Sequence, residues 1–478
     1  MYKYTWDEET GGLLLLPELS KFSKEPRPVY YKELDILGFD KYWNYPKDDH
    51  APLLWAEANN YIYKGRTIAK VTGGALYTPP GLVVLDKDPE PGGKPLEFVD
   101  VPHMCEKNRA IMEALVQETV QQVYQTYESY KTRIDVFYVA FSGGKDSVVA
   151  LDMVQRALPH EAFKVVFGDT DMEFPTTLAL INDIRDDCKE NGITFIHAKS
   201  QMRSLDSWKV FGPPSRRIRW CCTVHKTAPV INKLCELYGF NNLHAMMTTG
   251  VRAEESFARS SYDMISMGKK LEGQYSFHPL LYWSSAEIFL HIFGNHLRLN
   301  EAYKLGFNRV GCIICPNSSE RHEYMKKCSF PDLVKAYTDI IAETCAKDLS
   351  GDNRKRFFEI GAWKTRLSGR ELKFSEEERF QFQEKSGKLI FEVKNLNNDW
   401  KQWYKTMGDM VQDDQGYLLE YKKVWRRCVL QTGAKNAFII DNEKRDKNTI
   451  EFVSLFKAVL AKMEYCVQCQ TCPAECPN

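Results

Sequence analysis

The feature that most constrains this chain is the hexapeptide Ser142-Gly143-Gly144-Lys145-Asp146-Ser147. The residues before it, 134–141, are β-branched and aromatic, which predicts a buried parallel strand. The residues after it repeat apolar side chains at helical spacing. A glycine turn between a strand and a helix directs backbone N–H groups and the positive helix end at a phosphate. We therefore predict a nucleotide phosphate site, in which Lys145 adds a positive charge and Asp146 is free to meet a metal ion.

The hexapeptide differs from the G-x-x-x-x-G-K-[ST] loop of motor and kinase proteins. It resembles the loop of the PP-loop ATP pyrophosphatases, which split ATP between the α- and β-phosphates and leave AMP on a substrate. The resemblance implies that Ser142, Gly143, Gly144 and Ser147 bind ATP. It also implies catalytic roles for Lys145 and Asp146. The alternative is an ordinary turn between a strand and a helix.

Two acidic residues follow the next predicted strand, 163–167, in the segment Gly168-Asp169-Thr170-Asp171. Open α/β sheets bind their ligands at the carboxyl ends of the strands. We therefore predict a catalytic Mg²⁺ role for Asp169 and an ATP contact for Asp171, to the metal or the ribose. A solvated turn with a helix cap is the alternative.

Arginines gather at two further places. Arg216, Arg217 and Arg219 precede the adjacent pair Cys221-Cys222 and suit a phosphate or a phosphodiester, with a solvated face as the alternative. Arg252 and Arg259 follow a predicted strand at 243–249 and are placed to meet phosphate or sulfate, Arg252 as an ATP ligand.

The chain has 14 cysteines. No apolar run has membrane-spanning length, and the first residues do not resemble a signal peptide. We therefore expect a cytoplasmic protein that does not bind a membrane. Metal or redox chemistry then fits the cysteines better than disulfides do. Lys plus Arg and Asp plus Glu both number 64, so any nucleic-acid surface must be local.

Several motifs follow one another in a specific order: the glycine loop, Asp-Thr-x-x-x-Phe-Pro, Cys-Cys, Gly-Val-Arg-x-x-x-Ser and Gly-Cys-x-x-Cys-Pro. This set resembles the phosphoadenosine phosphosulfate reductase family in the broad sense, over about residues 130 to 330. The resemblance implies a doubly wound parallel sheet of the adenine nucleotide α-hydrolase type. In the adenosine phosphosulfate reductases, a Cys-Cys pair and a Cys-x-x-Cys hold a [4Fe–4S] cluster. The matching positions here are Cys221, Cys222, Cys312 and Cys315, and Zn²⁺ is the alternative metal.

The departures from the reductases shape the predicted function. The reductases have a degenerate glycine loop and a catalytic Glu-Cys-Gly-x-His, whereas this chain keeps the full loop and has no such pentapeptide. It more closely resembles the ATP pyrophosphatase of DNA phosphorothioation systems and the iron–sulfur tRNA thiolases. We therefore predict ATP-dependent adenylation coupled to iron–sulfur-assisted sulfur transfer, with DNA, tRNA or a small metabolite as acceptor. The resemblance implies a cysteine desulfurase and an electron donor as partners. The alternatives are a sulfonucleotide reductase and a nucleotide-sensing subunit of a nucleic-acid-binding or defence complex.

The cysteines near the end of the sequence have the C-x2-C-x2-C-x3-C-P spacing of bacterial ferredoxins, at Cys466, Cys469, Cys472 and Cys476. This spacing predicts a second [4Fe–4S] site, with zinc as the minority alternative. In two-cluster ferredoxins the fourth cysteine serves the other cluster. We therefore expect that the natural protein is longer or that a remote cysteine completes the site.

The expected organisation has four parts. They are a β-rich domain at 1–101, the PP-loop domain at 102–345, a helical and α+β region at 346–464 and the ferredoxin-like motif at 465–478. In the third part, we expect strands over 389–393, 417–424 and 437–440 and helices over 399–410 and 449–463. The basic stretch 354–370 is expected on a helix that either follows a phosphate backbone or faces solvent.

Overall fold

The computed structural model describes residues 1–21, 23–239, 242–267, 273–367, 380–394, 396, 398–433, 436–441 and 446–475. The chain forms two compact units. The first comprises Met1–Lys373 with Gln470–Asn478, and the second comprises Phe374–Cys469.

A six-stranded sheet forms the centre of the first unit, in the order β10-β9-β8-β11-β13-β12. Its strands are β8 Val136–Phe141, β9 Lys164–Asp169, β10 Thr194–Lys199, β11 Ala245–Thr248, β12 Ile265–Met267 and β13 Gln274–Phe277. The pairs β10–β9, β9–β8, β8–β11 and β11–β13 are parallel, and β12 is antiparallel to β13. The chain winds outward from β8 to β10 and then returns to place β11 on the other side of β8. The winding therefore reverses between β8 and β11, which is where a doubly wound sheet opens its ligand crevice.

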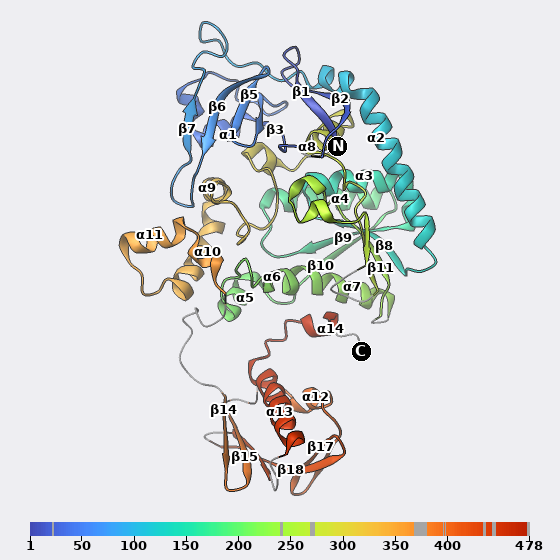
Figure 1. Cartoon of the computed structure of the whole chain (residues 1–478), viewed down its shortest axis with the longest axis vertical. Coiled ribbons are helices and arrows are strands. Elements are labelled where there is room, and N and C mark those ends of the chain that lie inside the picture. Colours follow the sequence, from blue (N-terminus) through green and yellow to red (C-terminus); the bar gives the residue numbers. More distant parts are fainter. Residues whose placement is uncertain are drawn as a thin grey trace. The chain divides into compact units, whose positions relative to one another are not determined.

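Helices cover both faces of this sheet (Figure 1). They are α2 Val101–Tyr130, α3 Lys145–Ala157, α4 Pro175–Glu190, the π-helical turn η3 Thr223–Thr227, α7 Ala228–Tyr238 and α8 Ser285–Gly294. Helices α5 Ser204–Phe211 and α6 Trp220–Cys222 lie between β10 and η3 in the chain. Strand β8 shows why two layers are needed. Phe137 and Val139 pack into a core with α3 and α8, whereas Val136 and Tyr138 pack with Leu234 of α7. Alternate side chains of a buried strand point to opposite faces, so both faces must be covered. The predicted doubly wound α/β class is confirmed.

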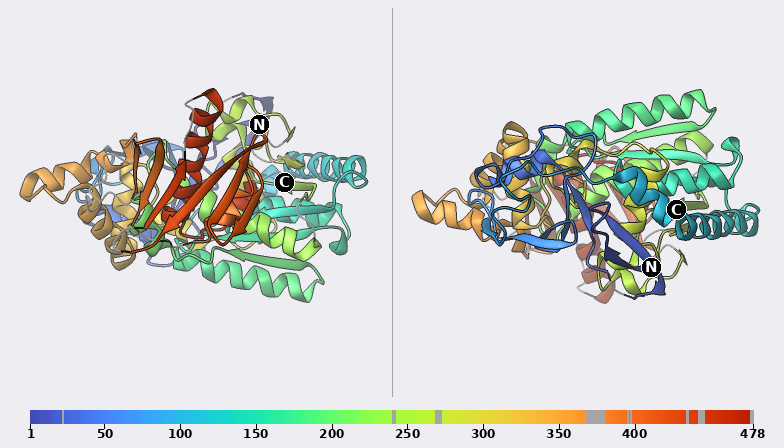
Figure 2. Two further views of the ribbon diagram at one scale, coloured as in Figure 1. Left: turned by 90° about the horizontal axis from the view of Figure 1, so that it is seen from below. Right: turned by 90° about the horizontal axis from the view of Figure 1, so that it is seen from above.

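The β-rich N-terminal region is also confirmed. A five-stranded antiparallel sheet contains β3 Arg27–Val29, β4 Leu54–Glu57, β5 Asn60–Tyr63, β6 Arg66–Thr72 and β7 Gly81–Val84. A hairpin of β1 Tyr2–Trp6 and β2 Leu13–Leu19 precedes it, and α1 Tyr31–Leu37 and η1 Phe39–Lys41 lie between β3 and β4. Figure 2 shows these strands and the long helix α2 from above.

Short helical elements complete the first unit. They are η2 His160–Ala162, η4 Ala253–Glu255, η5 Arg259–Ser261, η6 Glu301–Leu305, α9 Glu320–Ser329, α10 Pro331–Cys345, α11 Gly351–Glu359, η7 Ala362–Thr365 and α14 Thr471–Glu475.

The helix expected over 354–370 is present only in the first part of that range. Helix α11 ends at Glu359, and Gly361 has a φ of 62° that breaks it. Lys364 and Arg366 are buried and bonded to the Ser318 and Pro213 carbonyl oxygens, so they do not line an exposed basic face. Arg370 lies outside the described residues.

The second unit is a six-stranded antiparallel sheet with one long helix, α13 Lys447–Tyr465. In spatial order its strands are β14 Phe380–Lys385, β15 Lys388–Val393, β19 Asn436–Asp441, β18 Val424–Gln431, β17 Gly416–Tyr421 and β16 Met410–Asp413. The core between sheet and helix includes Phe391, Phe438 and Phe456.

Two predicted boundaries in the second unit are wrong. The helix expected over 399–410 is the short α12, Trp400–Tyr404, and Met410 already begins β16. The strand expected over 417–424 is interrupted because Lys422 and Lys423 adopt positive φ and turn the chain into β18. Throughout the described parts of the chain, no helix is long and apolar enough to cross a membrane.

Candidate functional site

The glycine loop joins β8 to α3 at the point where the winding of the sheet reverses. Gly143 has a φ of 71°, and a Cβ there would lie 2.8 Å from Thr177 Cγ2. The Ser142 N–H donates to Ser147 Oγ at 3.2 Å, and Ser147 Oγ donates to the Gly144 carbonyl at 2.8 Å. Only glycine combines this backbone with so close an approach to α4. The loop is therefore held in one shape at the N-terminus of α3.

Two side chains hold the backbone of the loop by hydrogen bonds: one lies in η6, and the other belongs to the residue just before η6. Asn300 Nδ2 donates to the Gly143 carbonyl at 3.0 Å, and Tyr303 accepts the Lys145 N–H through its hydroxyl at 2.9 Å. The sequence analysis gave neither residue a role, because both lie more than 150 residues from the loop. They are positioning residues for the loop.

The two charged residues of the loop belong to one buried cluster of ion pairs. The Lys145 side chain is 3% exposed, and its Nζ donates to Asp146 Oδ2 at 2.8 Å. Arg252 Nε donates to Asp146 Oδ1 at 2.7 Å, and the Arg252 guanidinium also pairs with Glu254. Burial alone would raise the pKa of Asp146, but Arg252 and Lys145 outweigh it and lower the pKa to about 2.

This cluster changes two expectations. Asp146 is not free, since each of its oxygens accepts a hydrogen bond from a cation. Arg252, predicted to contact ATP, is buried and holds Asp146 in place. A Mg²⁺ role for Asp146 and an ATP contact for Arg252 stay predictions.

The acidic pair lies at the carboxyl end of the neighbouring strand β9. Asp169 Oδ2 bonds to His197 Nε2 at 3.0 Å and lies 3.3 Å from Lys199 Nζ. Burial alone would raise the pKa of Asp169, but His197 and the Asp171 N–H outweigh it and lower the pKa to about 2. Asp171 has a φ of 60° and accepts a hydrogen bond from the Ser204 N–H at 3.0 Å. Both carboxylates are therefore ionised at neutral pH, as Mg²⁺ ligands must be.

Four cysteines from two distant segments share one neighbourhood. Cys221 is buried, and the neighbouring sulfurs of Cys222, Cys312 and Cys315 together with burial raise its pKa far above the ordinary value. Burial also raises the pKa of Cys312 to about 12, with Cys315 contributing. Thiolates repel one another in this way unless a cation is shared among them.

The donor set fits a four-thiolate metal centre in residue type and in grouping. Among the residues that the structure describes, however, no three His, Cys, Asp or Glu side chains are already arranged as a metal site. A metal at Cys221, Cys222, Cys312 and Cys315 therefore stays a prediction.

The predicted phosphate-binding arginines differ in their surroundings. Arg259 pairs with Glu255, which also pairs with Arg309. Arg216 Nε donates to the Pro316 carbonyl at 3.2 Å. Arg217 and Arg219 are exposed, and neither side chain forms a hydrogen bond or ion pair with another described residue.

The ferredoxin-like cysteines are divided between the two units. Cys466 and Cys469 belong to the second, whereas Cys472 lies on α14 in the first. Asn232 Nδ2 of α7 donates to the Gln470 carbonyl at 2.8 Å, and α14 packs against α7. Cys476 lies outside the described residues. A cluster at this run stays a prediction.

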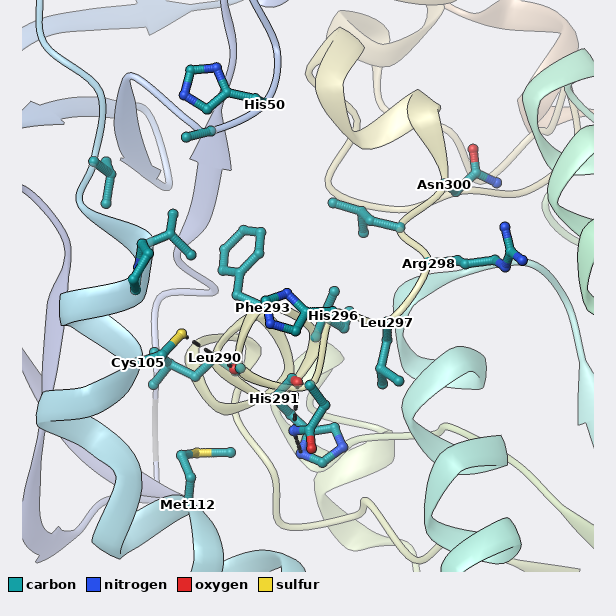
Figure 3. A pocket seen from close by; sticks show the side chains of 18 of the residues that line it. His50, Cys105, Met112, Leu290, His291, Phe293, His296, Leu297, Arg298 and Asn300 are labelled. Carbon is teal, nitrogen blue, oxygen red and sulfur yellow. Dashed lines mark hydrogen bonds between the residues drawn. The ribbon is translucent and has the colours of Figure 1, made fainter.

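A large cavity lies beside helix α2 and the end of α8 (Figure 3). It has a volume of about 1550 Å³ and is lined by one face of α2, including Cys105 and Met112, and by the segment from Leu290 to Asn300. No sequence motif indicated it. Asn300 connects it to the glycine loop.

A doubly wound sheet with a glycine loop at its switch point defines a nucleotide-binding α/β domain. Residues 113–318 match the model of the phosphoadenosine phosphosulfate reductase domain. This part of the chain therefore resembles that domain.

Individual relatives cover part of the chain. An uncharacterised protein of Methanocaldococcus jannaschii is 30% identical over 265 residues, which are 55% of this chain and 52% of the relative. A second protein of that organism is 26% identical over 52% of this chain and 58% of its own length. The match thus spans little more than half of these relatives. The adenosine 5'-phosphosulfate reductase of Oceanobacillus iheyensis is 28% identical over 40% of this chain and 73% of its own length.

Two solved structures are distantly similar. The phosphoadenylyl-sulfate reductase of Candida auris has a TM-score of 0.32 and 20% identity, and the match covers 46% of this chain and 98% of that one. The U34-tRNA thiolase of Methanococcus maripaludis with its [4Fe-4S] cluster has a TM-score of 0.29 and 14% identity, over 52% of this chain and 85% of that one.

Proposed function

We propose that this protein is an enzyme that cleaves ATP to AMP and pyrophosphate in order to adenylate an acceptor, which then receives sulfur. The observation that carries the proposal is the intact Ser142–Ser147 loop at the switch point between β8 and β11, above the buried cluster of Lys145, Asp146 and Arg252. The N-terminus of a helix at the switch point of such a sheet suits a pyrophosphate group.

The residues of the loop suit charge development during α,β-cleavage. An acceptor oxygen attacks the α-phosphorus, the bond from that phosphorus to the bridging oxygen breaks, and pyrophosphate leaves with the bond's electrons. The N-terminus of α3 and the Lys145 ammonium stabilise the growing negative charge. Arg252 keeps Asp146 ionised and oriented.

Asp169 and Asp146 are the carboxylates that would hold Mg²⁺, which supplies charge neutralisation on the phosphates. Because Asp146 is bonded to Lys145 and Arg252, metal binding there requires it to exchange one of these partners. Asp169 keeps its place at the end of β9 through His197.

Cys221, Cys222, Cys312 and Cys315 would hold a [4Fe–4S] cluster, or Zn²⁺ as the alternative. Such a cluster would bind the sulfur to be transferred, or would carry electrons. In the proposed second stage, two electrons from the electron donor reduce the sulfur donor's persulfide sulfur to hydrosulfide. The hydrosulfide attacks the carbon or phosphorus that bears the adenylated oxygen, and AMP leaves with that oxygen. A cysteine desulfurase as sulfur donor and a separate electron donor complete the proposal, and the ferredoxin-like run would take the electrons.

A nucleic acid is the acceptor class that the charge distribution favours. Residues 199–226 carry seven Lys or Arg and one Asp, although the whole chain is balanced. Four of these cations are exposed, and their side chains form no hydrogen bond or ion pair with another described residue: Arg203, Lys209, Arg217 and Arg219. A small anion would be held by convergent, buried cations, whereas exposed and dispersed cations suit a phosphodiester chain.

The salt dependence of nucleic-acid binding tests whether the acceptor is a nucleic acid. Arg217→Gln with Arg219→Gln should lower the slope of log affinity against log salt by about 1.4 for single-stranded nucleic acid. The control is Arg354→Gln with Arg356→Gln on α11, a pair with the same spacing and exposure. An equal change from both pairs would contradict a specific surface at residues 199–226.

The first experiment is an anaerobic assay of pyrophosphate and AMP with Mg²⁺-ATP, with and without candidate nucleic acids. We expect pyrophosphate release that Lys145→Ala abolishes. Adenosine phosphosulfate reduction is the second candidate, favoured by the similarity to reductases. Release of sulfite from adenosine phosphosulfate without ATP cleavage would replace the proposed function by that one.

A further inference from the structure

A buried pair of lysines lies under the turn that carries Cys312 and Cys315. Lys326 of α9 is 6% exposed, and its ammonium donates to the Cys312 carbonyl and to Ser318 Oγ, both at 3.0 Å. Lys364 of η7 is fully buried, and its ammonium donates to the Ser318 carbonyl at 3.0 Å and to Glu323 Oε1 at 2.9 Å. Two buried ammonium groups therefore contact the segment that carries two of the predicted metal ligands.

The charges of this pair do not balance within the buried site. Glu323 is the buried carboxylate that pairs with Lys364, whereas the hydrogen bonds of Lys326 go to a neutral carbonyl and a neutral hydroxyl. Glu320, at 3.7 Å from Lys364, is 44% exposed and so contributes little. The Lys326 ammonium also lies 5.6 Å from the Phe174 ring centre, which is a weak substitute for an anion.

An uncompensated buried ammonium is costly, so a nearby anion is expected. The groups around Lys326 that become negative are the Cys312 and Cys315 sulfurs, together with Glu323. Four thiolates around either an oxidised [4Fe–4S] cluster or Zn²⁺ carry two net negative charges, and one-electron reduction of the cluster adds a third. The lysine is thus placed where such a centre needs a positive charge.

We propose that Lys326 is the positioning and counter-charge residue of a four-thiolate metal centre at Cys221, Cys222, Cys312 and Cys315. Its ammonium fixes the Cys312 carbonyl, and thereby the Cys-x-x-Cys turn, and it stabilises the more negative, reduced form of an iron–sulfur cluster. This inference rests on the proposed function, since it requires a metal at the four cysteines.

The test uses the full chain with serine at Cys466, Cys469, Cys472 and Cys476, so that iron at the other four cysteines is measured alone. Iron and acid-labile sulfide per chain and the reduction potential are determined anaerobically. Lys326→Met removes the charge, and Lys326→Arg keeps it. Lys327→Met is the matched control, because Lys327 is the next residue and contacts the Tyr77 ring instead.

We expect Lys326→Met to shift the reduction potential to more negative values, or to lose the iron while Lys326→Arg retains it. Lys327→Met should match the parent protein. If the metal is zinc, Lys326→Met should release it at a lower chelator concentration.

The inference is overturned if Lys326→Met keeps the parent's metal content and potential, or if Lys326→Arg and Lys326→Met lose the metal equally. A parent protein that binds neither iron nor zinc would instead overturn the proposed metal centre. Pyrophosphate release, measured on the same samples, would still report on ATP cleavage separately.

Discussion

At the scale of single residues, the chemistry of the loop depends on one arginine that the loop does not contain. Arg252 is 1% exposed and lies against the carboxylates of Asp146 and Glu254. Among the residues that the structure describes, Glu254 Oε1 has no hydrogen-bond partner, so Arg252 is the main group that balances the charge of this carboxylate. A buried carboxylate that loses its cation is strongly destabilised.

Arg252→Met should therefore lower the free energy of unfolding of the first unit by about 3–5 kcal/mol, the usual loss for a broken buried pair. The measurement is urea unfolding followed by circular dichroism. Arg298→Met, which breaks an ion pair with Asp187 at 51% and 40% exposure, should cost less than about 1 kcal/mol. Equal losses would show that the cluster adds no stability of its own.

Asp152 of α3 predicts a pH effect. Burial alone would raise its pKa, but hydrogen bonds from His291 and Arg156 outweigh burial and hold it below the ordinary value of 3.8. Stability from such a carboxylate is present above pH 3.8 and is lost as the pH falls through the lowered pKa.

Asp152→Asn should therefore cost more stability at pH 6 than at about pH 3. Urea unfolding at both pH values measures the difference, with the exposed Asp183→Asn as the control. A cost that does not change with pH would contradict this assignment.

At the scale of elements, the local sequence pattern was sufficient to predict helices and strands whose buried side chains recur at regular spacing. Strands β8, β9 and β11 and helix α3 follow from their residue patterns and from the glycine turn, whereas the short β12 and β13 were not predicted. The errors fall where a single residue ends an element. Gly361 ends the helical stretch after α11, and Lys422 and Lys423 take positive φ although lysine gives no signal for it.

The site followed the same rule. The loop, Asp169 and the four cysteines could be predicted as candidates because each belongs to a recognisable motif, and their roles stay predictions. Asn300 and Tyr303 could not, because they contact the loop from more than 150 residues away.

Gly250, just after β11, gives the prediction for this scale. A Cβ there would lie 2.5 Å from the Asp146 carbonyl carbon and 2.6 Å from its oxygen, so the first turn of α3 must move. Gly250→Ala should therefore weaken ATP binding and cost about 1–3 kcal/mol, as overpacking does. Gly81→Ala is the control, since its nearest atom, Thr72 Oγ1, lies at an ordinary 3.5 Å. Calorimetric titration with ATP and thermal unfolding compare the two, and unchanged binding in Gly250→Ala would contradict the close packing.

At the scale of the whole molecule, the chain has two cores with different chemistry. The first unit contains the glycine loop and the four grouped cysteines, and the second has its own apolar core between one sheet face and α13. The sequence predicted a small α+β region here. It could not show that the ferredoxin-like spacing is shared between units, because spacing along a chain does not report which core each residue joins.

Separate cores should unfold separately. We expect two thermal transitions, and Mg²⁺-ATP at about 100 times its Kd should stabilise only the first unit, by about 2.7 kcal/mol. Phe456→Ala, which removes a fully buried ring from the second core, should lower only the transition of the second unit, with a cost of about 3–5 kcal/mol.

The reciprocal variant is Val149→Ala in α3, whose side chain is fully buried in the first core. Differential scanning calorimetry of the full chain resolves these cases. A single transition that ATP, Phe456→Ala and Val149→Ala all shift would mean that the two cores unfold as one cooperative unit.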